Sequence, residues 1–170
     1  QLERESRGWQ FHDAELKVGF EFTFTDAHHQ EHMVRIEGYT DRLDVHATNR
    51  QAAILDYKHQ SPDKIKKRAD QLMDDPQLLL YTKAISEEHR GTQYPVVEAE
   101  WVALKMNLKK KESSARSMTV DSLAEQVMAL DKQLYQDLSA VWSGSSLQAF
   151  APESACRYCE ARGICRKGMW

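Results

Sequence analysis

The sequence has no apolar run of membrane-spanning length and no signal peptide, so nothing in it indicates a membrane-bound or secreted protein. It also lacks an excess of positive charge. The 23 Lys and Arg residues stand against 26 Asp and Glu residues, which gives a formal net charge of -3. The overall charge therefore does not attract nucleic acid, and local basic patches must do so if the chain binds it. We expect a cytoplasmic protein.

Cysteine is scarce, and its three copies lie near the end of the chain in a C-x2-C-x5-C array, as Cys156, Cys159 and Cys165. Three thiols cannot form two disulfides, and the absence of secretory features suggests a reducing compartment. A metal site is favoured over a disulfide, although structural zinc sites and iron-sulfur clusters usually take four protein ligands. The alternative is three ordinary buried thiols in a small terminal helix.

The chain is long enough for one domain with a hydrophobic core. Its 170 residues are 41% apolar and 29% charged, which is ordinary for a soluble globular protein. We predict a core domain over residues 1–146 and a cysteine segment over 147–170 that packs on the same domain. Because the sequence begins without methionine, we expect it to be a fragment of a larger protein.

Hydrophobic periodicity predicts a mixed sheet with helices. Clean alternation from Leu16 to Phe24 indicates a half-buried strand, and three more strands would complete a four-stranded meander over 14–24, 33–39, 41–46 and 54–58. Helices are expected from Pro62, from Pro76 to Gly91 and over 120–142, with a strand over 96–106 and a loop over 107–114 between the last two. The loop over 26–32 holds three histidines, which form either a solvated loop or a set of metal ligands.

Three charged residues at one hairpin carry the functional prediction. A turn centred on Asn49-Arg50 would place Asp41 opposite Lys58 and Leu43 opposite Asp56. Directly opposed residues share a face, so two carboxylates and an ammonium group would converge on one patch of sheet. Such a patch is suited to a hard divalent cation. The alternative is a solvated surface ion pair, but the flanking apolar residues favour a buried hairpin, where unpaired carboxylates are costly.

Three motifs in order resemble those of the PD-(D/E)XK nuclease superfamily, and in particular its RecB and AddB branch of helicase-nuclease DNA repair enzymes. The motifs are Gly38-Tyr39-Thr40-Asp41-Arg42-Leu43-Asp44, Leu55-Asp56-Tyr57-Lys58 and Gln77-Leu78-Leu79-Leu80-Tyr81. The resemblance covers roughly residues 9 to 170. It implies an α/β restriction-endonuclease-like fold, with a mixed central sheet flanked by helices.

The resemblance also implies roles for single residues. Asp41 and Asp56 would bind Mg²⁺ or Mn²⁺, with the carbonyl of Tyr57 as a further ligand, and Lys58 would be the catalytic lysine. Gln77 and Tyr81 lie four residues apart on one helical face, and the family uses this pair near the reaction centre or the DNA. Tyr81 could instead cap the core. Glu15 resembles an accessory glutamate of the family, and its other interpretation is an exposed strand residue.

In the AddB-like branch, three such cysteines and one upstream cysteine hold a [4Fe-4S] cluster. Cys156, Cys159 and Cys165 match the downstream three, and the sequence has no fourth cysteine. The branch also places an active-site histidine in an N-terminal helix, whereas His12 is the only histidine among residues 1–12 and is poorly placed for that role. We therefore expect a C-terminal nuclease fragment whose longer parent completes the cluster.

Short basic runs are candidates for contacts with DNA phosphates. One run is Lys64, Lys66, Lys67 and Arg68. A second consists of Lys105, Lys109, Lys110 and Lys111, and a third lies around the cysteines, with Arg157, Arg162, Arg166 and Lys167. Phosphate contacts carry no sequence information, so we expect binding without sequence specificity, to DNA that is single-stranded. The resemblance adds a helicase domain or subunit as partner. The hypothesis is a metal-dependent DNA exonuclease domain, and its rival is an inactive DNA-binding or scaffold domain of the same fold.

Overall fold

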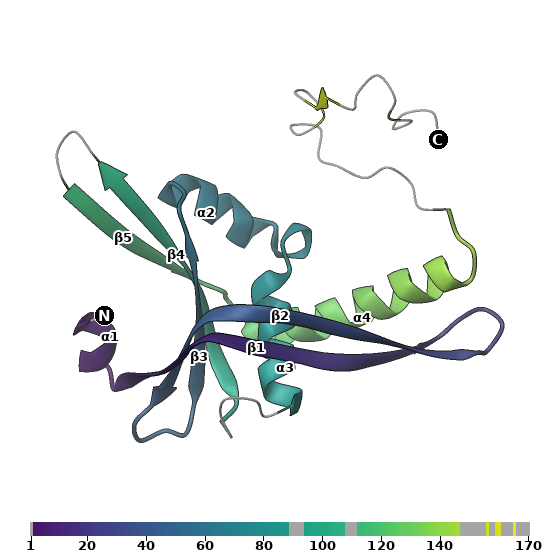
Figure 1. Cartoon of the computed structure of the whole chain (residues 1–170), viewed down its shortest axis with the longest axis horizontal. Coiled ribbons are helices and arrows are strands. Elements are labelled where there is room, and N and C mark those ends of the chain that lie inside the picture. Colours follow the sequence, from purple (N-terminus) through teal and green to yellow (C-terminus); the bar gives the residue numbers. More distant parts are fainter. Residues whose placement is uncertain are drawn as a thin grey trace.

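The computed structural model describes residues 2–88, 94–107 and 112–146, together with Cys156, Cys159, Glu160 and Cys165. Within these residues, five strands form one sheet in the order β1-β2-β3-β4-β5 (Figure 1). Neighbouring strands are antiparallel except β3 and β4, which are parallel. The predicted mixed α/β sheet flanked by helices is thus confirmed. The elements are α1 (Leu2–Ser6), β1 (Trp9–Thr25), β2 (Glu31–His46), β3 (Ala52–Lys58), α2 (Pro62–Asp70), the 3-10 turn η1 (Leu72–Asp74), α3 (Gln77–Glu88), β4 (Val96–Asn107), β5 (Glu112–Thr119) and α4 (Leu123–Trp142).

The hydrophobic core lies against one face of the sheet. Phe20 and Phe24 of β1, each 1% exposed, follow the predicted alternation, and Trp101 of β4 is fully buried. Helices α2, α3 and α4 all contribute to this core, which is why the central strands are covered on this side. Helical spacing over 120–142 predicts an apolar stripe on α4, and five of its six members pack on the same cluster: Leu123, Val127, Leu130, Leu134 and Leu138, but not Val141.

The opposite face is covered in part by α1. Glu98 and Glu100 alternate along β4 with the core residues Ala99 and Trp101, so the two glutamates point to the other side. Arg4 of α1 forms ion pairs with both glutamates. The short N-terminal helix therefore lies on the side of the sheet away from the core.

Two features of the predicted strands are wrong. The strands predicted over 33–39 and 41–46 are one continuous strand, β2, so the meander has three strands and not four. Residues 112–114, predicted as loop, begin strand β5, which pairs with β4. Periodicity missed β5 because its sequence, ESSARSMT, is polar and belongs to a strand at the edge of the described sheet. The helix end predicted at Gly91 lies outside the described residues.

The long β1–β2 hairpin extends beyond the other strands and runs alongside α4 (Figure 1). Its tip is bound to the end of α4, because Ser143 Oγ accepts from Ala27 N at 2.8 Å and Ser139 Oγ donates to Thr25 O at 2.7 Å. Phe24 also meets Trp142 edge to face, with ring centroids 5.1 Å apart. These contacts make the hairpin part of the same packed unit as the helices.

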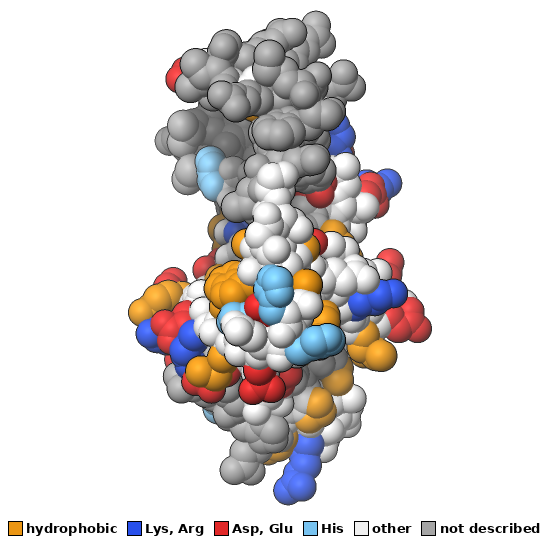
Figure 2. Space-filling model, turned by 90° about the vertical axis from the view of Figure 1, so that its right-hand side faces the viewer, with side chains coloured by type: hydrophobic (Ala, Val, Ile, Leu, Met, Phe, Trp, Pro, Cys, Tyr) orange, Lys and Arg blue, Asp and Glu red, His pale blue; other side chains and the backbone are white. Residues whose placement is uncertain are grey.

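The histidine-rich tip of the β1–β2 hairpin is a turn stabilised by hydrogen bonds to Asp26. Asp26 accepts hydrogen bonds from the backbone N–H groups of His28 and Gln30, and lies 2.8 Å from His32 Nε2. The contact with His32, followed by these backbone bonds, lowers the pKa of Asp26 to about 2. Histidine side chains are visible on this end of the molecule in Figure 2. Among the described residues, no three His, Cys, Asp or Glu side chains form a group that could hold a metal ion, so the tip shows no metal-ligand set.

None of the described helices is both long and apolar enough to cross a membrane.

Candidate metal and catalytic site

The register of the β2–β3 hairpin differs from the predicted one by two residues. Leu43 pairs with Ile54 and not with Asp56, so continuing the ladder by two residues places Asp41 beside Asp56 and not beside Lys58. The cause is the turn. His46 N donates to Gln51 O, which closes the loop around Thr48-Asn49, one residue earlier than predicted. Because side chains alternate with period two, a shift of two residues leaves the same side chains on the same face.

Asp41 and Asp56 lie on neighbouring strands with different environments. Asp41 Oδ2 accepts a hydrogen bond of 2.7 Å from the backbone N–H of Tyr57. Asp56 is 1% exposed; Lys58 Nζ lies 2.7 Å from its Oδ2, while its Oδ1 has no hydrogen-bond partner among the described residues. Burial raises the pKa of Asp56, Lys58 opposes this rise, and the charge of Asp41 adds to it.

Lys58 connects this pair to α3. Its Nζ donates to Gln77 Oε1 at 2.8 Å, and Gln77 Nε2 donates to the hydroxyl of Tyr81 at 2.9 Å. The predicted helical spacing of Gln77 and Tyr81 thus brings both side chains to the site. The structure joins Asp56, Lys58, Gln77 and Tyr81 in one continuous chain of polar contacts.

Gly38 is the residue whose role the sequence reasoning missed. A Cβ atom at this position would lie 2.7 Å from Cε1 of Tyr81, so only glycine lets the ring rest on β2. The backbone of Gly38 belongs to a regular strand rather than to a turn. A glycine inside an otherwise regular strand is the signal that could have identified this close approach.

The donor set fits a divalent metal ion. Mg²⁺ and Mn²⁺ take oxygen ligands, and Asp41 and Asp56 bring carboxylate oxygens together on neighbouring strands of the β2–β3 hairpin. Asp56 Oδ1 has no hydrogen-bond partner within the described residues, which supports this fit because a buried carboxylate oxygen without a partner is costly until a cation or donor satisfies it.

Glu15 lies on β1 between the pairs Ala14–Arg42 and Leu16–Thr40, and therefore across from Asp41. Its backbone has a left-handed φ of 52°, and its side chain is exposed. No three-membered group of acidic, histidine or cysteine side chains suited to a metal occurs in the described part of the chain. The accessory role of Glu15 stays a prediction.

The predicted basic run falls on α2 and divides into two kinds of residue. Lys64, Lys66 and Lys67 are exposed on the helix surface. Arg68 is partly buried, with Nε donating to Gln60 Oε1 at 3.1 Å and Nη1 paired with Asp75. Its positive charge also counteracts the rise in the pKa of Asp56.

Asp44, the second acid of the first motif, lies on the side of the sheet away from the site. Its two oxygens pair with Arg4 Nε at 2.9 Å and Arg42 Nε at 2.6 Å. Arg4 also reaches Glu100, which is 4% exposed, at 2.5 Å. These ion pairs connect α1, β2 and β4, so the contacts of Asp44 stabilise the fold.

None of the three cysteines is in a disulfide in the described structure; Cys156 is partly buried, and Cys159 and Cys165 are exposed. Cys159 N donates to Cys156 O at 3.4 Å, but the rest of the segment lies outside the described residues. Among the described residues, no three His, Cys, Asp or Glu side chains lie close enough together to hold a metal ion. The structure therefore lends no support to a cluster bound by this chain alone.

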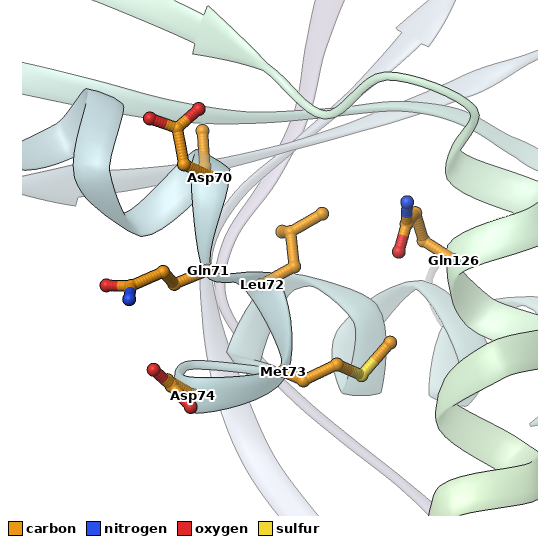
Figure 3. Close-up of a pocket in the computed structure, with 7 residues that line it drawn as sticks. Asp70, Gln71, Leu72, Met73, Asp74 and Gln126 are labelled. Carbon is orange, nitrogen blue, oxygen red and sulfur yellow. The ribbon is translucent and has the colours of Figure 1, made fainter. Parts of the chain in front are cut away.

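A hollow of about 340 Å³ lies away from this site, between α2, η1 and α4 (Figure 3). Leu72 and Met73 point toward Gln126, whereas the carboxylates of Asp70 and Asp74 point away from it. The hollow thus has a mixed polar and apolar lining and lacks the converging charges of the Asp41–Asp56 site.

A mixed sheet with two carboxylates and a lysine on adjacent central strands is an arrangement suited to metal-dependent phosphodiester hydrolysis. Residues 1–166 match the family model of the PD-(D/E)XK nuclease superfamily, and the chain belongs to that superfamily. The family implies nuclease activity, with DNA as substrate and divalent metal ions as typical cofactors. No curated protein matches the chain significantly.

Proposed function

We propose that this chain is a metal-dependent deoxyribonuclease domain of the RecB/AddB-like kind, acting as an exonuclease on single-stranded DNA without sequence specificity. The observation that supports it best is the buried Asp56, which lies beside Asp41 and Lys58 and whose Oδ1 lacks a hydrogen-bond partner in the described part of the chain. A carboxylate in this state is poised to bind a cation.

In this proposal Asp41, Asp56 and the carbonyl of Tyr57 hold Mg²⁺ or Mn²⁺. The bound ion would lower the pKa of a coordinated water and neutralise charge on the scissile phosphate. Lys58, held by Asp56 and Gln77, places its ammonium group where it can orient the attacking water and stabilise charge on the phosphate. Gln77 fixes Lys58 and Tyr81 in position, and Lys64, Lys66, Lys67 and Arg68 contact DNA phosphates.

The wider setting is also proposed. The parent is a helicase-nuclease or a RecB-family exonuclease of DNA repair and recombination, with residues 1–146 as the nuclease core and 147–170 as a cysteine segment. Cys156, Cys159 and Cys165 would supply three ligands of a [4Fe-4S] cluster, with the fourth from the parent protein. Iron and zinc analysis of that parent separates this cluster from a zinc site.

The test is degradation of single-stranded DNA with Mg²⁺ or Mn²⁺ by wild type, Asp56→Ala and Lys58→Ala. Both substitutions should abolish most of the activity. Asp137→Ala and Lys132→Ala change exposed residues of α4 and are the matched controls. If the site variants cut as well as the controls, the assignment fails.

A calorimetric titration with Mn²⁺ separates the nuclease from an inactive scaffold of the same fold. The nuclease predicts binding that Asp56→Ala removes. No binding at millimolar metal would favour the scaffold.

A further inference from the structure

A groove of about 330 Å³ opens beside the chain of contacts that leads from Lys58 to Tyr81. Gln77 and Tyr81 belong to both, so the groove is continuous with the candidate site. Asp75, which also lines it, is paired with Arg68. The walls come from β1, β2 and the start of α3, with the lining residues Val18–Phe20, Ile36–Gly38, Asp75–Gln77, Leu80, Tyr81 and Ala84.

The lining combines apolar side chains with a few polar ones. Ile36, Leu80 and Tyr81 are partly exposed and supply apolar surface, and Tyr81 adds an aromatic ring. Glu37 adjoins the groove through β2, but its carboxylate pairs with Lys17 and Arg35 on the other face of that strand. Asp75 is paired with Arg68. The described residues that line the groove include no Lys, Arg or His, so a phosphate group would meet no cation of the lining, whereas an uncharged aromatic ring would meet apolar surface.

The volume of the groove limits the size of the aromatic ligand that it can hold. Small-molecule sites usually measure about 300–1,000 Å³, so this groove is at the lower end, with room for one nucleoside and not for a duplex. We propose that the groove holds the base of one nucleotide adjoining the scissile phosphate, separated from its neighbours in the strand. This inference rests on the proposed nuclease function, since it names how that same site receives its substrate.

Two consequences follow. A base can enter the groove only when it is unpaired, so the groove selects single strands or frayed ends. Contact with an aromatic ring and apolar walls accepts any base, because each base has a π-face. The groove thus gives strand selectivity without sequence specificity.

The test measures binding without catalysis. The full chain carrying Asp56→Asn is titrated in EDTA with a fluorescently labelled pentathymidylate and with pentamers that lack one base at successive positions. Loss of the base from one particular position should weaken binding by about tenfold, while loss elsewhere has a smaller effect. A uniform effect at every position would overturn the proposal.

Two further variants locate this effect. Ile36→Trp fills the groove, and Val34→Trp is the matched control, because both residues are partly buried on the same face of β2 and only Ile36 lines the groove. Ile36→Trp should remove the position-specific penalty, and Val34→Trp should keep it. Equal penalties in the two variants would contradict the assignment.

Photocrosslinking keeps the test independent of how well Ile36→Trp folds. A pentamer with 5-iodouracil at the sensitive position, irradiated with the Asp56→Asn protein, should crosslink to Tyr81 or another groove residue identified by mass spectrometry. A crosslink elsewhere overturns the groove assignment. Position-specific binding by a protein whose wild type cuts no DNA would instead overturn the nuclease function and leave the groove intact.

Discussion

Two buried carboxylates on the same hairpin, Asp44 and Asp56, have opposite surroundings. Both are at most 1% exposed. Asp44 lies on the face of the sheet away from the core, where Arg4 and Arg42 pair with its two oxygens. Asp56 lies on the core face, where Lys58 contacts one oxygen and the other has no hydrogen-bond partner within the described residues.

This difference in pairing distinguishes a carboxylate that stabilises the fold from one that is available to bind a ligand. A buried carboxylate whose oxygens are both paired stabilises the arrangement of its partners and has no free ligand atom. A buried carboxylate left partly unpaired lowers stability and is retained where a ligand completes it. By this criterion Asp44 is a structural residue and Asp56 is the acid that we propose for the reaction centre, although both stand in motifs that resemble the same family.

The largest expected effect comes from replacing each acid by its amide. Asp56→Asn should lower nuclease activity by at least about 100-fold, because loss of a group that merely supports a metal ligand already costs about 10–100-fold. Asp44→Asn should lower the free energy of unfolding by about 3–5 kcal/mol, because two buried guanidinium groups lose their charged partner. Urea denaturation and single-stranded DNA degradation measure the two outcomes. Equal stability losses in the two variants would remove the distinction.

Arg4 tests the structural side of the comparison. Arg4→Met leaves Asp44 and Glu100 without this cation and should lower the free energy of unfolding by about 3 kcal/mol. Arg7→Met is the control, since Arg7 is 55% exposed and touches Glu98 only at 3.4 Å; its loss should change stability by less than about 1 kcal/mol. Thermal and urea unfolding of both variants decide the matter. Similar changes would mean that the buried network contributes little.

Gly38 tests the functional side. Gly38→Ala brings a Cβ atom against Tyr81 and should cost about 1–3 kcal/mol, with reduced nuclease activity because Gln77 and Lys58 lose their positions. In a Tyr81→Ala background the ring is absent, so the added methyl group should cost much less stability. A double-mutant cycle measures this coupling. If Gly38→Ala is equally costly in both backgrounds, its effect does not pass through Tyr81.

The smallest expected effect is a contrast in pH dependence between Asp56 and Asp26, measured as the melting temperature of metal-free protein. Burial raises the pKa of Asp56, so its folded form favours the proton, and the stability of wild type relative to Asp56→Asn should fall as pH rises above about 4. The pKa of Asp26 is lowered to about 2, so wild type should exceed Asp26→Asn at neutral pH and lose this advantage between about pH 4 and pH 2. Parallel trends for the two variants would contradict the opposite signs.

Much of the fold was predictable from local patterns. Alternation along β1 and the apolar stripe of α4 predicted the faces that form the core, because burial of one face imposes its period on the sequence. The polar strand β5 was not predictable in this way, since an edge strand is stabilised by backbone pairing with β4 rather than by an apolar face.

The candidate site was predictable in its members and less so in its geometry. Asp41, Asp56 and Lys58 were expected on one face, and Gln77 and Tyr81 on one helical face near them. The predicted register was wrong by two residues, since five loop residues can close a turn in more than one way and local sequence does not select among them. The wrong register still placed the three side chains on the correct face of the sheet, because a shift of two residues does not change the face.

What the sequence by itself determined is the set of chemical groups and the face that each occupies, because the periods of strands and helices follow from backbone geometry alone. Only the tertiary structure decided which buried acid is paired. Arg4 lies 40 residues before Asp44, and Gln77 lies 19 residues after Lys58, so these contacts exist only when distant segments pack together. That packing places Tyr81 on Gly38 and, among the residues the structure describes, leaves one oxygen of Asp56 without a hydrogen-bond partner; no local pattern contains either fact.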